Sequence, residues 1–126
     1  MDEKHIPSIS DIKILVTIQY LNERGYYPLH TGILKILNGV VDFETKEFLD
    51  CPTFQSLISF NAKKISRALL LLHRYNYVKK VYDQETDALY YAIDEKGKAL
   101  LLTKKYRFKR NAKQEKTTIV KINVIK

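Results

Sequence analysis

The feature that most restricts the fold of this chain is a helix followed directly by two strand-forming runs, between residues 61 and 93. Asn61 is a favourable helix cap, and apolar side chains then recur at helical spacing as far as Tyr75. Residues 78–83 and 88–93 are rich in β-branched and aromatic side chains, and the short polar segment QETD separates them. This pattern predicts a β-hairpin after the helix, and therefore a fold that mixes helices with strands.

Three further helices are expected on either side of this unit. Residues 11–24 end before a glycine, residues 30–37 end at Asn38-Gly39, and residues 94–102 begin with two acidic residues. The expected order is helix, helix, helix, strand, turn, strand, helix. We predict an α+β, mainly α fold: a winged helix-turn-helix with three helices, a β-hairpin wing and a C-terminal helix. In that arrangement the third helix is the one that meets DNA.

The first predicted helix is apolar nearly all round. Ser8 or Ser10 is its expected cap. One side carries Ile14, Ile18 and Leu21, and the other carries Ile12, Val16 and Tyr20. Such a helix is either buried on several sides or shared with a partner. We expect a homodimer that covers the second side; the C-terminal tail or a different protein are the alternatives.

Basic residues are concentrated at the end of the chain. The 126 residues carry a formal net charge of +8, yet residues 1–102 hold 13 basic and 13 acidic residues and sum to zero. Residues 103–126 hold nine basic residues and one acid, Glu115. We expect one domain, residues 1–102, and a basic tail, residues 103–126, in which residues 117–125 have strand character. Such tails commonly bind polyanions, although a tail that only keeps the chain soluble has the same composition.

A second basic group lies on the predicted third helix. At about 100° per residue, Lys63, Arg67 and Arg74 fall within about 40° of one another, opposite the apolar face, and Lys64 flanks them. No acidic residue occurs from residue 61 to residue 80, whereas a solvated helix face is usually mixed in sign. This is the composition that phosphate contacts need. Leu70 lies within the basic face and fits a thymine methyl group or a protein contact equally well.

The candidate nucleic-acid contacts combine this helix with the base of the wing and the start of the tail. The turn at residues 84–87 is acidic and should be repelled by phosphate, so the base of the wing is preferred. In residues 104–110 aromatic rings alternate with cations, a pattern suited to stacking on bases. The predicted contacts are Lys63, Lys64, Arg67, Arg74, Lys79, Lys80, Lys104, Lys105, Tyr106, Arg107, Lys109 and Arg110.

Four segments resemble, in order, those of one family. Residues 33–39 (ILKILNG) look like its helix-then-glycine segment, and residues 51–57 (CPTFQSL) are similar to its Leu-Pro-Thr-Tyr-Gly stretch. Residues 65–77 look like its long leucine-bearing helix, and residues 89–101, which include DEKG, look like its strand and Thr-Glu-Lys-Gly-like close. Over roughly residues 12–102 the chain thus resembles the RQC domain, the winged-helix DNA-binding module of RecQ-type helicases.

This resemblance implies a free-standing RQC-like DNA-binding protein. The chain departs from the family because it has no helicase motor, no four-cysteine zinc segment and no aromatic residue at the wing tip, and because Gln55 stands where glycine is usual. The aromatic-tipped wing separates strands in some members. Strand separation is therefore not implied for this chain.

No catalytic, metal or membrane pattern accompanies these features. His5, His30 and His73 show no metal-ligand spacing with one another or with Cys51, the single cysteine. No stretch approaches the ~18 apolar residues of a membrane span, and the start of the chain, MDEKH, lacks the apolar run of a secretory signal. We expect a cytoplasmic protein that is not an enzyme and takes no metal or cofactor.

Three classes of partner remain open. Duplex DNA is preferred, with a role in regulation or as an accessory to DNA processing. The second is another protein, docked through the first helix and through Leu70 and Leu71. The third is RNA or the ribosome, with the tail as the main contact.

Overall fold

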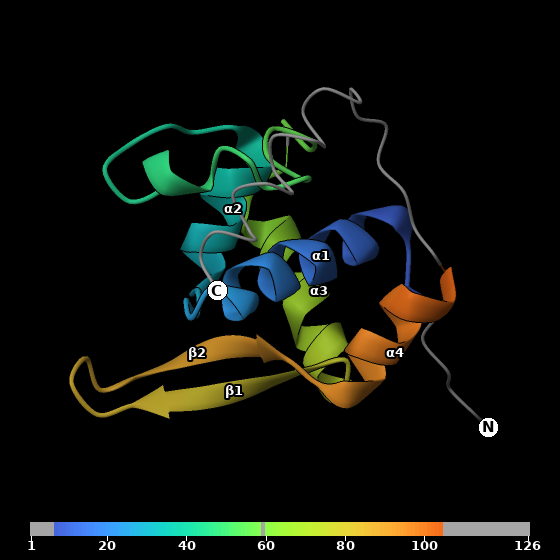
Figure 1. Ribbon diagram of the computed structural model, residues 1–126. Helices are drawn as coiled ribbons and strands as arrows, with labels where there is room; N and C mark the ends of the chain where they lie inside the picture. Colours follow the sequence, from blue (N-terminus) through green and yellow to red (C-terminus); the bar gives the residue numbers. More distant parts are fainter. Residues whose placement is uncertain (1–6, 59, 105–126) are drawn as a thin grey trace.

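The computed structural model describes residues 7–58 and 60–104, which form an α+β fold that is mainly helical (Figure 1). Its four described α-helices and two described strands follow the predicted order, and a short 3-10 helix that was not predicted lies between the second and third α-helices. The described elements are α1 (Ile9–Glu23), α2 (His30–Asn38), the short 3-10 helix η1 (Lys46–Phe48), α3 (Ala62–Arg74), β1 (Val78–Asp83), β2 (Ala88–Ile93) and α4 (Glu95–Lys104). The final helix α4 extends two residues beyond the boundary predicted at residue 102.

Local signals account for most helix ends. Ser8, rather than Ser10, caps α1, because its side chain accepts from the backbone N–H of Asp11 and the Asp11 carboxylate accepts from the Ser8 N–H in return. Asn61 caps α3 by accepting from the Lys64 N–H. Gly39 ends α2 in a left-handed conformation. Ile9 and Ser10 lie inside α1, so this helix begins two residues earlier than predicted.

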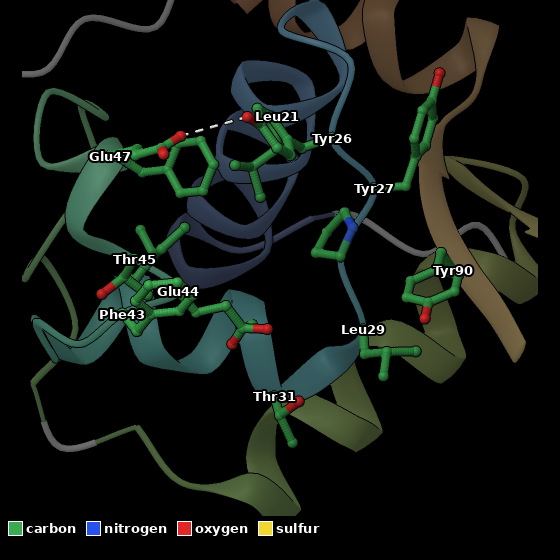
Figure 2. Close-up of a pocket in the computed structure, with 14 residues that line it drawn as sticks. Leu21, Tyr26, Tyr27, Leu29, Thr31, Phe43, Glu44, Thr45, Glu47 and Tyr90 are labelled. Atoms are coloured by element: carbon green, nitrogen blue, oxygen red, sulfur yellow. Dashed lines mark hydrogen bonds between the residues drawn. The ribbon is translucent and has the colours of Figure 1, made fainter. Parts of the chain in front are cut away.

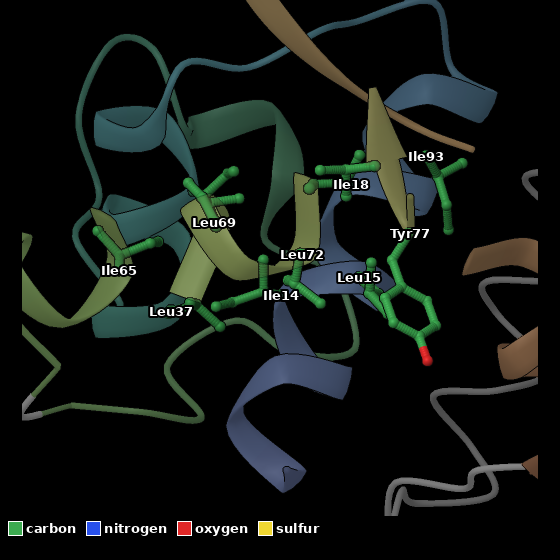
Figure 3. Packing of buried hydrophobic residues seen from close by; sticks show 11 residues of the cluster. Ile14, Leu15, Ile18, Leu37, Ile65, Leu69, Leu72, Tyr77 and Ile93 are labelled. Carbon is green, nitrogen blue, oxygen red and sulfur yellow. The ribbon is translucent and has the colours of Figure 1, made fainter. Parts of the chain in front are cut away.

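The main core lies where three helices meet the base of the hairpin (Figure 3). Ile14, Leu15 and Ile18 of α1 pack with the buried face of α3 and with α2. Val78 and Ile93, which face each other at the open end of the hairpin, enter the same cluster. The core therefore fixes both α3 and the hairpin relative to α1.

The second side of α1 is also buried within the single chain. Tyr20 and Ile12 are only 9% and 6% exposed, and Val16 is half-buried. Tyr20 packs with Leu21, Ile36 and Cys51 in a second cluster, which Phe48 and Phe54 flank. The apolar side of α1 from which we expected a homodimer is therefore covered within one chain. The homodimer stays a prediction, without this support.

The segment after η1 is tied to both α1 and α2. The Thr17 hydroxyl of α1 donates to the Lys13 carbonyl and hydrogen-bonds the Thr53 hydroxyl, and both threonine side chains are fully buried. Two N–H groups of this segment donate to carbonyls at the end of α2. Gln55 donates to Ile36 O at 2.8 Å, and Leu57 donates to Leu37 O at 2.9 Å. The bond from Leu57 gives the helix-end carbonyl of Leu37 a partner, whereas Ile36 O also accepts from the Gly39 N–H.

The hairpin is docked along the connection between α1 and α2. The Tyr91 N–H donates to the Pro28 carbonyl at 2.9 Å, and the Ile93 N–H donates to the Asn22 side chain at 2.9 Å. Within the hairpin, the antiparallel register pairs Val78 with Ile93 and Asp83 with Ala88. Both strands and the turn fall at the predicted residues. Asp87 supplies the left-handed conformation that the turn needs.

Candidate nucleic-acid interface

The predicted basic face exists on α3. Ile65, Leu69 and Leu72 are buried against the core, which directs the opposite side of the helix to solvent. On that side the cations are all exposed: Lys63, Lys64, Arg67 and Arg74. Within the part of the chain that the structure describes, none of these four has a carboxylate within ion-pairing distance. Their charge is therefore not neutralised by a described neighbour.

One apolar side chain interrupts this basic face. Leu70 is 60% exposed and lies between Arg67 and Arg74 along the helix surface. Leu71, at the edge, is half-buried. A stripe of two arginines around a leucine offers charge to phosphates and one methyl-bearing contact to a base or to a partner protein.

The predicted contacts at the base of the hairpin do not form one surface. Successive strand residues point to opposite faces of the sheet, so Lys79 and Lys80 diverge. Lys80 lies on the face of Val78 and Ile93, and its Nζ sits 5.7 Å from the centre of the Tyr91 ring. Lys79 lines a recess on the other face of the hairpin, together with Glu23 and Lys98. Both lysines were predicted as contacts, and the structure directs their side chains to opposite faces of the hairpin.

The tip of the hairpin is acidic and internally hydrogen-bonded. The Asp83 carboxylate accepts from the N–H and the hydroxyl of Thr86, at 2.9 and 2.8 Å. The Tyr82 hydroxyl donates to Asp87 at 2.6 Å, which raises the pKa of that tyrosine because the neutral form makes the bond. Glu85 remains exposed at the tip. Negative charge at this end of the hairpin disfavours phosphate contact there, as the sequence predicts.

Of the predicted tail contacts, only Lys104 falls within the described part of the chain. Lys104 is the last residue of α4. The other predicted tail contacts, Lys105, Tyr106, Arg107, Lys109 and Arg110, fall outside the described residues, as does the run at residues 117–125.

Chemical groups elsewhere in the described residues are few. No set of three His, Cys, Asp or Glu side chains in residues 7–58 and 60–104 is placed to hold a metal ion. Burial raises the pKa of the Cys51 thiol, which is 4% exposed and lies 3.3 Å from the Thr53 hydroxyl. None of the described helices has the length and apolar character needed to cross a membrane.

Comparisons with protein-family models, with curated proteins and with solved structures find no match to this chain. The candidate interface is therefore inferred from the charge and exposure of its own side chains.

Sequence reasoning missed a second group of exposed side chains, which are aromatic. Tyr26, Tyr27 and Phe43 are 48%, 45% and 86% exposed, and they come from two segments for which no helix or strand is predicted. The aromatic residues are visible in the sequence, but only a contiguous exposed group of them is informative, and the sequence does not show that they gather. Their arrangement around a cavity depends on the tertiary structure.

Proposed function

We propose that this chain is a winged-helix protein that binds duplex DNA through α3, in a regulatory or DNA-processing accessory role. The observation that supports this function most directly is the acid-free, exposed face of Lys63, Arg67 and Arg74. Each phosphate that a cation neutralises releases condensed counterions, so three adjacent unneutralised cations favour binding to a duplex. The buried opposite face of α3 holds these side chains on a rigid support.

The element order and one backbone contact favour the winged-helix assignment. Three helices precede a hairpin, and the Pro28 carbonyl accepts from Tyr91 of β2, so an extended connection between α1 and α2 lies beside the wing. The RQC-like resemblance gains one supporting detail. Gln55, at the position where that family carries glycine, has a left-handed φ of 62°, a conformation that glycine adopts at no steric cost.

A second candidate function is docking to another protein through the hairpin and α3. Leu70, Tyr82 and Leu89 are each at least half exposed, and Tyr82 and Leu89 are cross-strand partners. Salt dependence separates the two functions. Affinity for a fluorescent duplex, measured from low to moderate salt, should fall steeply if DNA is the ligand, whereas an apolar protein interface should change little. Parallel titrations with single-stranded DNA and structured RNA at one salt concentration identify the preferred nucleic acid.

Truncation after Lys104 should weaken binding without changing nucleic-acid preference. This deletion keeps α4 whole and removes eight basic residues and one acid. We expect affinity for duplex, single strand and RNA to fall by a similar factor, about 3-fold to 10-fold near 0.1 M salt, with a shallower slope of log affinity against log salt. An unchanged slope, in a truncated chain whose melting temperature matches the full chain, contradicts a role for the tail.

A further inference from the structure

A cavity of about 380 Å³ lies between residues 43–48, which include η1, and the connection from α1 to α2 (Figure 2). Its volume falls within the range of about 300–1,000 Å³ typical of small-molecule sites. Leu21 and Ile36, both buried, belong to its lining and to the second core cluster. Part of the cavity wall is therefore held rigidly by α1 and α2.

Aromatic rings form much of the cavity wall. Tyr26 and Phe48 meet edge to face, with ring centres 4.9 Å apart. Tyr27 and, from strand β2, Tyr90 lie on the hairpin side, and Phe43 lies on the loop side (Figure 2). Rings in such number present faces of negative potential, which attract cations.

Two cationic side chains of the protein already form cation–π contacts with aromatic rings in this region. The Arg24 guanidinium lies 3.7 Å from the centre of the Tyr20 ring, and Lys46 Nζ lies 4.8 Å from the centre of the Phe43 ring. Tyr20 also packs in the second core cluster, with two of the cavity-lining residues, Leu21 and Ile36. Cation–ring contacts therefore already form beside the cavity, one of them on the lining residue Phe43.

The charge of the cavity lining is negative. Among the described residues that line the cavity, the ionisable side chains other than tyrosines are Glu44 and Glu47, and none is a lysine, arginine or histidine. Glu44 is paired with Lys35 at 3.0 Å. Glu47 accepts a hydrogen bond from the Tyr26 hydroxyl at 3.3 Å, and no cation of the described residues lies within ion-pairing distance of it. Glu47 therefore adds to the aromatic wall a carboxylate that no cation in residues 7–58 and 60–104 pairs with.

We propose that this cavity binds a small organic cation with apolar substituents, such as a quaternary ammonium compound that carries an aromatic or branched alkyl group. The apolar part contacts Leu21, Ile36 and Phe48, and the positive charge lies between the rings and the Glu47 carboxylate. This site is separate from the basic face of α3 and stands whether or not α3 binds DNA.

The test uses the full chain and benzyltriethylammonium as the probe, with naphthalenesulfonate as an anion of comparable bulk. Calorimetric titration measures affinity, and backbone amide shifts in NMR spectra locate the probe. We expect saturable binding of the cation, with shifts at the cavity residues, and no shifts there with the sulfonate. Glu47→Gln, which keeps the shape and removes the charge, should weaken cation binding about 3-fold to 10-fold.

Glu85→Gln is the matched control, because it makes the same change in net charge at the exposed hairpin tip. It should leave cation binding unchanged. Absence of saturable binding, equal loss in both variants, or equal binding of the sulfonate in the cavity overturns the proposal. A wild type that sediments as a dimer and shows no probe-dependent amide shifts at the cavity residues also overturns the proposal. Unchanged melting temperatures confirm that neither variant acts through unfolding.

Discussion

Simultaneous replacement of Lys63, Arg67 and Arg74 by glutamate should weaken binding to duplex DNA at least ~10-fold at moderate salt, because three cations on one exposed face become three anions. The slope of log affinity against log salt should become shallower as well. These residues are exposed and lie opposite the core, so the fold should be retained. Fluorescence anisotropy with a labelled duplex, at several salt concentrations, measures both quantities.

A single-site comparison controls for net charge. Arg67→Glu and Lys46→Glu change the charge of the chain equally, but Lys46 lies in η1 among acidic residues, outside α3. We expect Arg67→Glu to weaken DNA binding and Lys46→Glu to have a much smaller effect. If the triple variant is folded and binds like the wild type, α3 is not the DNA-binding helix. Equal losses from the two single variants would indicate that only overall charge matters.

Leu70→Ala separates the two readings of the basic face. If Leu70 touches DNA, its replacement by alanine should lower affinity for the duplex. If Leu70 serves a protein contact instead, the replacement should leave DNA binding unchanged. The same titrations that test the triple variant provide the measurement. Because Leu70 is exposed, its removal leaves no cavity in the core.

Replacement of Gly97 by alanine should destabilise the fold by about 2 kcal/mol or more, despite the better helix propensity of alanine. A Cβ at this position would overlap the Tyr77 carbonyl oxygen and would lie 2.9 Å from Cγ1 of Ile93. The Tyr77 carbonyl also accepts from the Asp94 N–H at 3.0 Å. The backbone at the base of the hairpin therefore cannot move aside without loss of that bond.

Gly32→Ala is the matched control, since Gly32 and Gly97 each occupy the third position of a helix. A Cβ at Gly32 would lie 3.6 Å from the Pro28 side chain, an ordinary contact. We expect this variant to be neutral or more stable by up to about 1 kcal/mol. Urea unfolding, followed by circular dichroism, measures both changes. A Gly97→Ala variant as stable as Gly32→Ala would show that the close approach at Tyr77 is not required.

Local signals in the sequence were sufficient for the element order. The asparagine at position 61, the glycine at position 39 and the polar turn at residues 84–87 each act within a few residues of the backbone that they terminate. Helical spacing likewise identified the buried and exposed sides of α3, because that helix has one apolar face and its opposite face is basic. Strand alternation in the sequence would also have separated Lys79 from Lys80, although the prediction grouped them.

The tertiary structure alone decided how the second side of α1 is covered and where the aromatic cavity lies. Both depend on residues 40–57, an irregular segment without a repeating apolar pattern, whose course is fixed by contacts distant in sequence, such as that of Thr53 with Thr17. The role of Gly97 has the same origin. Glycine is required at position 97 because a Cβ there would overlap the Tyr77 carbonyl oxygen, which approaches it only after α3, the hairpin and α4 have packed together. Local patterns determine which segments become helices or strands, whereas close approaches between segments exist only in the packed chain.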